Sequence, residues 1–439
     1  MPLLFAIYLN DFNNFLSTKF DGLIELSQEV NRIHNIDEIE TYLKLYTLLY
    51  ADDTVILAES EKELQKALDA LEIYCKLWQL HVNLDKTKIF IFSRGKVSKH
   101  ITFLFGGNPV EVVPEYVYLG VVMNYNNKFS KAIQKQILLA RKALFVLNAK
   151  ILELDLPIDI QIKLFETLIL PILTYGCEIW GFSDLNSIEL FHRRFIKDCL
   201  KISKFASNSI ACGESGLQNI ENIIYTRMIC FWNKFRQSQS NKLSFKMFKF
   251  IKLLYDRNIY HSKWCTKVCY ILDSTGLSYV WNWEGISTYR LKRLLKQRLY
   301  DAFVQNWSSD MAENSLCTNY KIFKTEFRFE NYLLTLDDDL RIPLTKYRCG
   351  SHYLPISEHR YNGVCDDHRC PLCLNDTGDE FHYIFICPAF DSYRTRFIDS
   401  HLYKRANALN FQKLFTSTSK EKLERLSKFV KVILHVFRP

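Results

Sequence analysis

Two short apolar runs separated by turn residues predict a β-hairpin near the start of the chain. The runs span residues 46–50 and 55–58 and are rich in Leu, Tyr, Val and Ile. Such runs bounded by Asp are typical of two strands joined by a turn. Ser60 and Glu63 follow as a capping-box pattern, which predicts the start of a helix. The apolar face of that helix consists of Leu64, Ala67, Leu68, Leu71, Cys75 and Trp78. We expect this face to pack against a sheet.

The pattern then adds strands, followed by long helical stretches. Residues 89–92 and 116–122 are β-prone, whereas residues 126–204 show the periodicity of amphipathic helices. One helical stripe consists of Ile133, Ile137, Ala140, Leu144 and Leu147, and another of Leu164, Phe165, Leu168 and Ile172. Residues 205–336 are mostly helical in pattern but carry no recognisable motif. The predicted fold class is therefore α+β, with a mainly helical remainder.

The turn of the predicted hairpin carries two adjacent carboxylates, Asp52 and Asp53. Carboxylates held at such a tip can bind divalent cations. Polymerases place them in this way around two Mg²⁺ ions about 3.5–4 Å apart, which activate the attacking 3′-hydroxyl and stabilise the leaving pyrophosphate. The alternative is an ordinary surface turn rich in Asp, which the Asp pair by itself does not exclude.

The order of motifs around this pair resembles the reverse transcriptases of non-LTR (LINE-type) retrotransposons. Residues 50–53 resemble the metal-binding motif of the palm, residues 78–88 the next motif, and residues 116–122 the primer-grip hairpin. Residues 2–11 resemble the tail of a motif that begins with Gln-Gly in this family. The resemblance implies a palm followed by a thumb, RNA-directed DNA polymerase chemistry with Mg²⁺, and a primer-template of RNA and DNA as partner.

The resemblance also implies roles for individual residues. Asp52 and Asp53 would be the catalytic Mg²⁺ ligands, with Asp52 the stronger candidate. Lys86 falls where the family has a lysine near the incoming triphosphate. The candidate nucleic-acid contacts are Tyr118, Gly120 and Lys88. For Lys88, an ordinary solvated charge is the alternative.

One part of the family's metal site has no counterpart in this sequence. In the family, the fingers and the first palm strand lie upstream, and that strand supplies another metal-binding Asp. Asp11 lies on a helical pattern and Asp37 in a polar stretch, so neither is a credible replacement. We therefore expect the C-terminal part of such an enzyme, truncated within the palm and without autonomous polymerase activity. An upstream or complementing half would supply the rest.

A second pattern of candidate metal ligands consists of Cys370, Cys373, His382 and Cys387. Four Cys and His ligands at short spacing are what a closed tetrahedral structural Zn²⁺ site requires. The segment resembles the zinc-knuckle-like module that follows the polymerase in many of these elements. A buried cluster of free thiols is the alternative. A zinc deaminase is not favoured, because its His-x-Glu motif does not occur in the sequence.

Composition narrows the protein class without identifying it. The 439 residues are 48% hydrophobic, enough for two or three domains. A net charge of +9 suits a nucleic-acid partner but also fits an ordinary surface. Thirteen cysteines, an odd number, favour an intracellular, reducing compartment, either nucleus or cytoplasm. The longest apolar stretch, residues 164–182, is interrupted by Glu166, Pro171 and Glu178, so no membrane association is expected.

These patterns predict a domain organisation. The expected parts are a partial palm (1–125), a thumb-like helical region (126–204), a helical region of unknown role (205–336), a zinc-knuckle-like module (337–400) and a helical tail (401–439). Two basic stretches, residues 242–252 and 290–298, alternate cations with apolar residues such as Phe248, Phe250 and Leu294. Such stretches contact nucleic acid or form the solvated face of a helix.

Three functions remain open at this point. The chain is a truncated reverse transcriptase, a non-catalytic nucleic-acid-binding protein that uses the thumb and zinc module, or a non-functional retroelement remnant.

Overall fold

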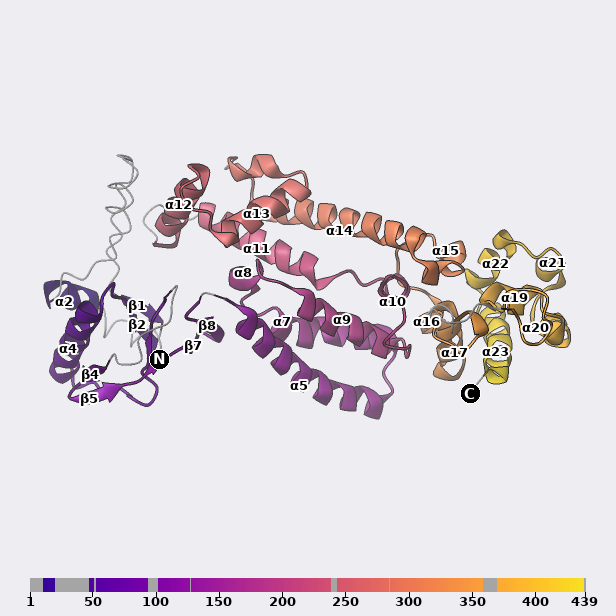
Figure 1. Cartoon of the computed structure of the whole chain (residues 1–439), viewed down its shortest axis with the longest axis horizontal. Coiled ribbons are helices and arrows are strands. Elements are labelled where there is room, and N and C mark those ends of the chain that lie inside the picture. Colours follow the sequence, from indigo (N-terminus) through magenta and orange to yellow (C-terminus); the bar gives the residue numbers. More distant parts are fainter. Residues whose placement is uncertain are drawn as a thin grey trace. The chain divides into compact units, whose positions relative to one another are not determined.

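The computed structural model describes residues 11–19, 47–50, 53–93, 102–126, 128–237, 243–283, 285–357 and 369–437 (Figure 1). The chain divides into two compact units. The first comprises Met1–Ala132, Ile229–Leu272 and Tyr279–Thr288, and the second Ile133–Met228, Asp273–Ser278 and Tyr289–Pro439. Strands occur in the first unit, as four two-stranded sheets among the described residues, and helices dominate elsewhere. The coarse α+β prediction therefore agrees with the structure.

The predicted acidic hairpin is present in the first unit. Strands β1 (Thr47–Tyr50) and β2 (Asp53–Ile56) are antiparallel and pair Tyr50 with Asp53. A second hairpin joins β7 (Glu115–Tyr118) to β8 (Val121–Asn124). Its turn residues Leu119 and Gly120 have φ angles of 46° and 81°. Positive φ at both turn positions is the geometry that suits the twist of a tight hairpin.

Helix α4 (Glu61–Leu77) begins where the capping pattern predicts. The Ser60 hydroxyl accepts a hydrogen bond from the Glu63 N–H at 3.3 Å, while the Glu63 carboxylate accepts from the Glu59 N–H at 3.1 Å. The buried residues of α4 are Ala67, Leu68, Ala70, Tyr74 and Cys75. Trp78 is 39% exposed just beyond the last helical residue, so its assignment to the buried face was wrong.

Two small cores hold α4 in place. On one side, Leu68 packs with residues of three short strands, β3 (Ile89–Phe90), β4 (Phe103–Phe105) and β5 (Asn108–Val110). Strand β6 (Val112–Val113) pairs with β3 in parallel. On the other side, α2 (Phe12–Lys19) packs Phe12 and Leu16 against Tyr74. The expectation that the helix packs against a sheet is confirmed, although each sheet is small.

The first unit also contains α12 (Leu243–Asp256) and most of α13 (Lys263–Ser274), together with the 3₁₀ turn η2 (Ser278–Trp281). Trp232 and Trp281 stack with ring centres 5.6 Å apart and planes only 2° from parallel. The Arg236 guanidinium lies 4.5 Å from the Trp232 ring centre. Aromatic stacking and a cation over a ring therefore fix this part of the chain.

The second unit begins with the helices predicted for residues 126–204. They are α5 (Ser130–Leu154), α6 (Ile158–Leu164), the π-turn η1 (Phe165–Ile169), α7 (Leu170–Leu173), α8 (Cys177–Trp180) and α9 (Asn186–Cys199). The predicted stripe is wrong at Leu168, which is 51% exposed, whereas Ile169 is buried. Pro171 lacks the N–H that a regular helix needs, and the Leu170 N–H bonds to Phe165, five residues back. This π-turn shifts the buried face by one residue.

The rest of the second unit is mainly helical, as predicted for residues 205–336 and 401–439, whereas no helices were predicted for residues 337–400. It contains α10 (Asn208–Ser215), α11 (Ile220–Arg236, in part), α14 (Thr288–Glu313), α15 (Tyr320–Phe323), α16 (Tyr332–Thr335), α17 (Asp338–Arg348), α19 (Glu380–Phe385), α20 (Asp391–Phe397), α21 (Ser400–Tyr403), α22 (Ala408–Phe415) and α23 (Lys420–Val436). Within the described ranges, no helix combines the length and apolar character needed to cross a bilayer.

A buried ion pair links α10 to α17. The Arg348 guanidinium lies 2.8 Å from the Glu214 carboxylate and 3.0 Å from that of Glu330. The side chains of Arg348 and Glu214 are 1% and 0% exposed. The Tyr332 hydroxyl also donates to Glu214, at 2.6 Å. Such a network is stable only when every charged atom has a partner, so it fixes the relative positions of these elements.

Candidate functional site

The first candidate site lies at the two hairpins of the first unit. Asp53 begins β2 and is exposed, whereas Asp52 lies outside the described residues. Tyr118 ends β7, and burial raises its pKa, with a further contribution from the negative charge of Asp53. A charge shifts a neighbouring pKa most strongly at short range. The effect on Tyr118 therefore indicates that Asp53 and Tyr118, two residues chosen from separate sequence motifs, lie in the same part of the first unit.

The two candidate lysines differ in their surroundings. Lys88 forms an ion pair with Glu111 at 2.7 Å, and this pair accounts for its charge without nucleic acid. Lys86 is exposed in the loop before β3. Among the described residues, no contact joins Lys86 to Asp53. Gly120 occupies the left-handed turn of the second hairpin, a position that favours glycine on conformational grounds alone.

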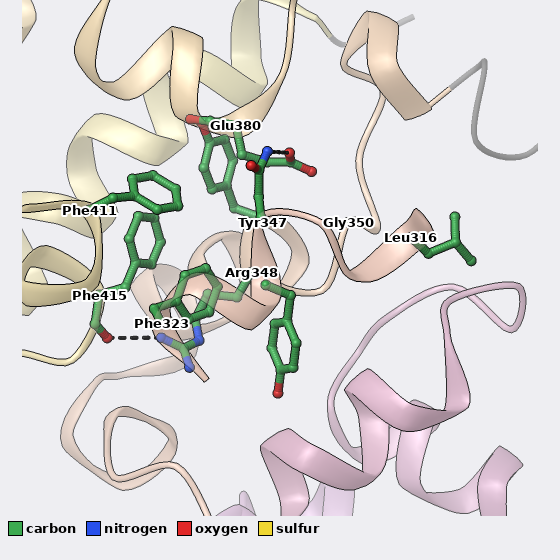
Figure 2. Close-up of a pocket in the computed structure, with 10 residues that line it drawn as sticks. Leu316, Phe323, Tyr347, Arg348, Gly350, Glu380, Phe411 and Phe415 are labelled. Carbon is green, nitrogen blue, oxygen red and sulfur yellow. Dashed lines mark hydrogen bonds between the residues drawn. The ribbon is translucent and has the colours of Figure 1, made fainter. Parts of the chain in front are cut away.

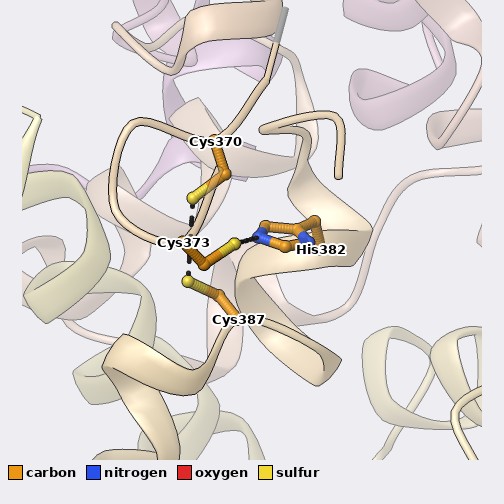
Figure 3. A group of neighbouring side chains, drawn as sticks. All are labelled: Cys370, Cys373, His382 and Cys387. Atoms are coloured by element: carbon orange, nitrogen blue, oxygen red, sulfur yellow. Dashed lines mark hydrogen bonds between the residues drawn. The ribbon is translucent and has the colours of Figure 1, made fainter. Parts of the chain in front are cut away.

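The second candidate site is the Cys and His cluster of the second unit (Figure 3). The ligand atoms of Cys370, Cys373, His382 and Cys387 all lie within 4.8 Å of one another. The Cys370 and Cys387 sulfurs are 3.7 Å apart, and the Cys373 sulfur lies 3.4 Å from His382 Nε2. With Zn–S bonds of about 2.3 Å and Zn–N bonds of about 2.0 Å, a tetrahedral site has ligand separations of roughly 3.5–3.8 Å. The two shortest pairs match these separations, and the cluster as a whole, which spans up to 4.8 Å, is compatible with a Zn²⁺ site.

A tight turn positions the first two ligands. The Cys370 N–H donates to the Asp376 carbonyl at 2.7 Å, and the Leu374 N–H donates to the Cys370 carbonyl at 2.8 Å. Leu374 has a φ of 60°, which closes the turn. Gly378 passes so close to this turn that a Cβ there would lie 2.5 Å from the Tyr383 hydroxyl oxygen. A larger residue at position 378 would push the turn away from the helix that carries His382.

Helix α19 positions the histidine. The Asp379 carboxylate caps the helix by accepting a hydrogen bond from the His382 N–H at 2.8 Å. The Glu380 carboxylate is hydrogen-bonded to Asn319 at 2.5 Å and to His352 at 3.0 Å. The Glu380 carbonyl accepts from the Tyr347 hydroxyl at 2.7 Å. The start of α19 is therefore held from three directions.

Figure 2 shows Glu380 and Tyr347 beside a cavity of about 10 Å³, which has room for at most one water molecule.

Arg394 supports the segment that carries Cys387. Its guanidinium donates to the Cys387 carbonyl at 2.8 Å and to the Ile384 carbonyl at 2.9 Å. The backbone that carries these ligands is thus hydrogen-bonded, whereas His382 Nδ1, the ring nitrogen that would face away from a metal, has no hydrogen-bond partner among the described residues and lies 3.8 Å from the Asp376 carboxylate.

Burial and hydrogen bonds shift the pKa values of three residues of the cluster. Burial raises the pKa of Cys387 to about 12 and lowers the pKa of His382. For Cys370, burial also acts to raise the pKa, but the Tyr383 hydroxyl and nearby backbone N–H groups outweigh it and lower the pKa. Neutral His is the form that binds a metal, and a bound cation would drive the thiols to thiolates.

The supporting residues Glu380, Asn319, His352 and Arg394 were not identified as functional from the sequence. The sequence held one local signal for the start of α19, because Asp379 is of a type preferred at helix N-caps. Asn319, His352 and Arg394 carry no such signal, since they reach the cluster from other elements of the fold.

Comparison with known proteins bears on the first site. Residues 1–123 match the family described as Reverse transcriptase (RNA-dependent DNA polymerase). The chain is 31% identical over 145 residues to a putative uncharacterized transposon-derived protein of Caenorhabditis elegans, a match that covers 32% of this chain and 50% of that protein. The chain thus spans about half the length of this curated relative. No solved structure matches the chain. Residues 1–123 are therefore a reverse-transcriptase-like region, in a chain similar to a transposon-derived protein.

Proposed function

We propose that the chain contributes to the RNA-directed DNA polymerase of a non-LTR (LINE-type) retrotransposon. One observation supports the proposal: within the reverse-transcriptase match, the hairpin pairs Tyr50 with Asp53, and the charge of Asp53 contributes to the raised pKa of Tyr118. We infer that two motifs, which the polymerase would use at its metal ions and at its primer, lie close together. Asp85 is the control carboxylate in the test below, because it is exposed in the loop between α4 and β3 and belongs to neither hairpin.

In the proposed site, Asp52 and Asp53 hold Mg²⁺, which would activate the primer 3′-hydroxyl and stabilise the leaving pyrophosphate. Lys86 would neutralise the triphosphate, and Tyr118 would border the primer end. Among the described residues, Asp53 belongs to no group of three or more potential metal ligands. We therefore expect residues 1–439 alone to incorporate no nucleotides, and a further carboxylate from another polypeptide segment would complete the site.

Primer extension on an RNA template tests this proposal. The 439-residue polypeptide is compared with a version extended by the upstream reading frame, each with Mg²⁺ and with chelator. The extended version should incorporate nucleotides, and Asp53→Asn should abolish this while Asp85→Asn does not. Mg²⁺-dependent incorporation by the 439 residues alone would contradict the predicted incompleteness. Incorporation that is insensitive to Asp53→Asn would contradict the assigned site.

A second proposed role is nucleic-acid binding without catalysis, supported by the metal-site dimensions of the Cys and His cluster. A structural Zn²⁺ held by Cys370, Cys373, His382 and Cys387 would stabilise a small module that grips RNA or DNA together with the thumb-like helices. Salt-sensitive binding by residues 1–439, without incorporation under any condition above, selects this role.

A further inference from the structure

Helix α14 (Thr288–Glu313) presents two very different faces. Its buried side consists of Leu291, Leu295, Leu299, Trp307 and Met311. From residue 288 to residue 300 the helix contains five Lys and Arg residues and no carboxylate, and the first acidic residue is Asp301. The leucines already anchor the helix, so the cations are not needed for packing.

The exposed side carries a stripe in which tyrosines flank the cations. Tyr289, Arg293, Lys296 and Tyr300 recur at helical spacing, which places them on one face about 16 Å long. Lys292 lies beside this row. Tyr289 is 78% exposed and Tyr300 37% exposed. We call Tyr289, Lys292, Arg293, Lys296 and Tyr300 the basic stripe.

The cations of the basic stripe differ from those of the other basic segment, α12. On α12, Lys252 pairs with Asp256 at 2.5 Å, and Lys249 lies 4.9 Å from the ring centre of Phe245. The interleaved aromatics Phe248 and Phe250 are buried. Within the part of the chain that the structure describes, Lys292, Arg293 and Lys296 are exposed and form no ion pair. Lys249 and Lys252 thus interact with other residues of α12, whereas Lys292, Arg293 and Lys296 face solvent.

We propose that the basic stripe binds single-stranded nucleic acid. Its cations match the phosphate backbone, and each phosphate contact releases counterions from the nucleic acid. The protruding Tyr289 ring favours a single strand over a duplex, because only unpaired bases expose their faces for stacking on an aromatic side chain. The stripe lies outside residues 1–123, so the proposal does not depend on polymerase activity.

Fluorescence anisotropy with the full chain and a labelled twelve-nucleotide RNA of mixed sequence tests the proposal. The triple variant Lys292→Gln, Arg293→Gln, Lys296→Gln should bind at least tenfold more weakly. Its plot of log affinity against log salt should be shallower by about 2, at roughly 0.7 for each lost phosphate contact on a single strand. Tyr289→Ala should weaken binding roughly tenfold through lost stacking.

Matched variants distinguish binding by the basic stripe from a general effect of net charge on RNA binding. Lys404, Arg405 and Lys428 are exposed cations on other helices or loops, and Tyr353 is 66% exposed. Their substitution by Gln, and Tyr353→Ala, should leave affinity within twofold of the wild type. Thermal melting should be unchanged for all variants, since every altered side chain is exposed.

Four results would overturn the proposal. They are an absence of RNA binding by the wild type at low salt, an equal loss in the stripe and control triples, equal affinity for a blunt RNA duplex with no effect of Tyr289→Ala, and binding to phosphatidylserine vesicles in place of RNA. Failure of primer extension leaves these readouts unaffected, so the two proposals fail independently.

Discussion

The acidic hairpin and the Cys and His cluster are built in opposite ways. Asp53 stands exposed at the start of a four-residue strand, and its charge acts on Tyr118 across a neighbouring hairpin. In the cluster, Cys370 and Cys387 are fully buried and His382 is 2% exposed. Asp53 is thus open to solvent, whereas the four Cys and His side chains of the cluster are held together within one short segment and its support.

This difference has an energetic consequence. Exposed charges near water contribute little to folding, so an exposed carboxylate such as Asp53 can be changed at a small cost in the free energy of unfolding. Buried polar groups carry a desolvation cost and are stable only when each one is satisfied. We therefore expect substitutions in the second unit to affect stability first, and substitutions at the hairpin to affect chemistry first.

The largest expected effect is at the buried ion pair that supports the second unit. Glu214→Ala would leave Arg348 buried without its main partner, since the Glu214 carboxylate binds the guanidinium at 2.8 Å. Breaking one side of such a pair costs about 3–5 kcal/mol. Urea unfolding measures this change in the free energy of unfolding.

The exposed ion pair of Lys150 and Glu153 is the matched control. Both side chains are more than 60% exposed, so Glu153→Ala should change the free energy of unfolding by about 0–1 kcal/mol. Equal losses in the free energy of unfolding for Glu214→Ala and Glu153→Ala would show that the burial of an ion pair does not determine how strongly its removal destabilises this unit.

Metal removal should have the next largest effect. If zinc occupies the cluster at a free concentration of 100 times its Kd, chelation would remove about 2.7 kcal/mol of stability. Thermal melting with and without chelator, beside metal analysis of the purified chain, measures this. Cys373→Ser should abolish zinc retention and loosen the segment around residues 345–395.

Cys230→Ser is the control for cysteine loss, because Cys230 is half-buried on α11 and is not part of the cluster. It should retain zinc and respond to chelator like the wild type. Purified protein without zinc, unaffected by chelator, would identify the cluster as a buried group of thiols.

The sequence predicted features that depend on neighbouring residues far better than contacts between residues that are far apart in the sequence. The hairpin, the Ser60 cap and the spacing of the four cluster residues depend on neighbours along the chain, and the structure reproduces the first two and brings the four residues together. The buried face at Leu168 was misplaced, because a π-turn changes a periodicity that pattern reading takes as constant. The Glu214 and Arg348 pair joins residues 134 positions apart, and no sequence pattern relates them.

Acidification should weaken the second unit by a smaller amount. Burial acts to raise the pKa of Glu214, but the charge and hydrogen bonds of Arg348 outweigh it and hold the pKa below its ordinary value of 4.5. A depressed carboxyl pKa stabilises the fold above the unfolded pKa, and this stability is lost as pH falls through the folded pKa. Each unit of depression corresponds to about 1.4 kcal/mol.

The difference between wild type and Glu214→Gln isolates this group from the other carboxylates. Free energies of unfolding measured from pH 7 to pH 3 should fall more steeply for the wild type below about pH 4.5. Parallel curves for the two proteins would mean that Glu214 is not held ionised by Arg348.

The smallest stability effect is expected at the hairpin. Asp53→Asn should change the free energy of unfolding by less than about 0.5 kcal/mol, as for other exposed sites. Asp52→Asn should have an equally small effect, with a slight gain from relieved repulsion between the two adjacent charges. Urea unfolding checks this, and a loss of several kcal/mol would make the residue a structural hydrogen-bonding group.

A spectroscopic measurement sharpens the same comparison. Because the charge of Asp53 adds to burial in raising the pKa of Tyr118, Asp53→Asn should lower that pKa toward its ordinary value of 10.0, although burial still holds it above. Ultraviolet titration of tyrosinate, with Tyr118→Phe used to assign the signal, follows the shift. Asp85→Asn, in the loop after α4, should leave the titration unchanged. If the Asp53→Asn variant titrates like the wild type, Asp53 does not influence Tyr118. The inference that the two hairpins lie close together, on which the polymerase proposal rests, would then be wrong.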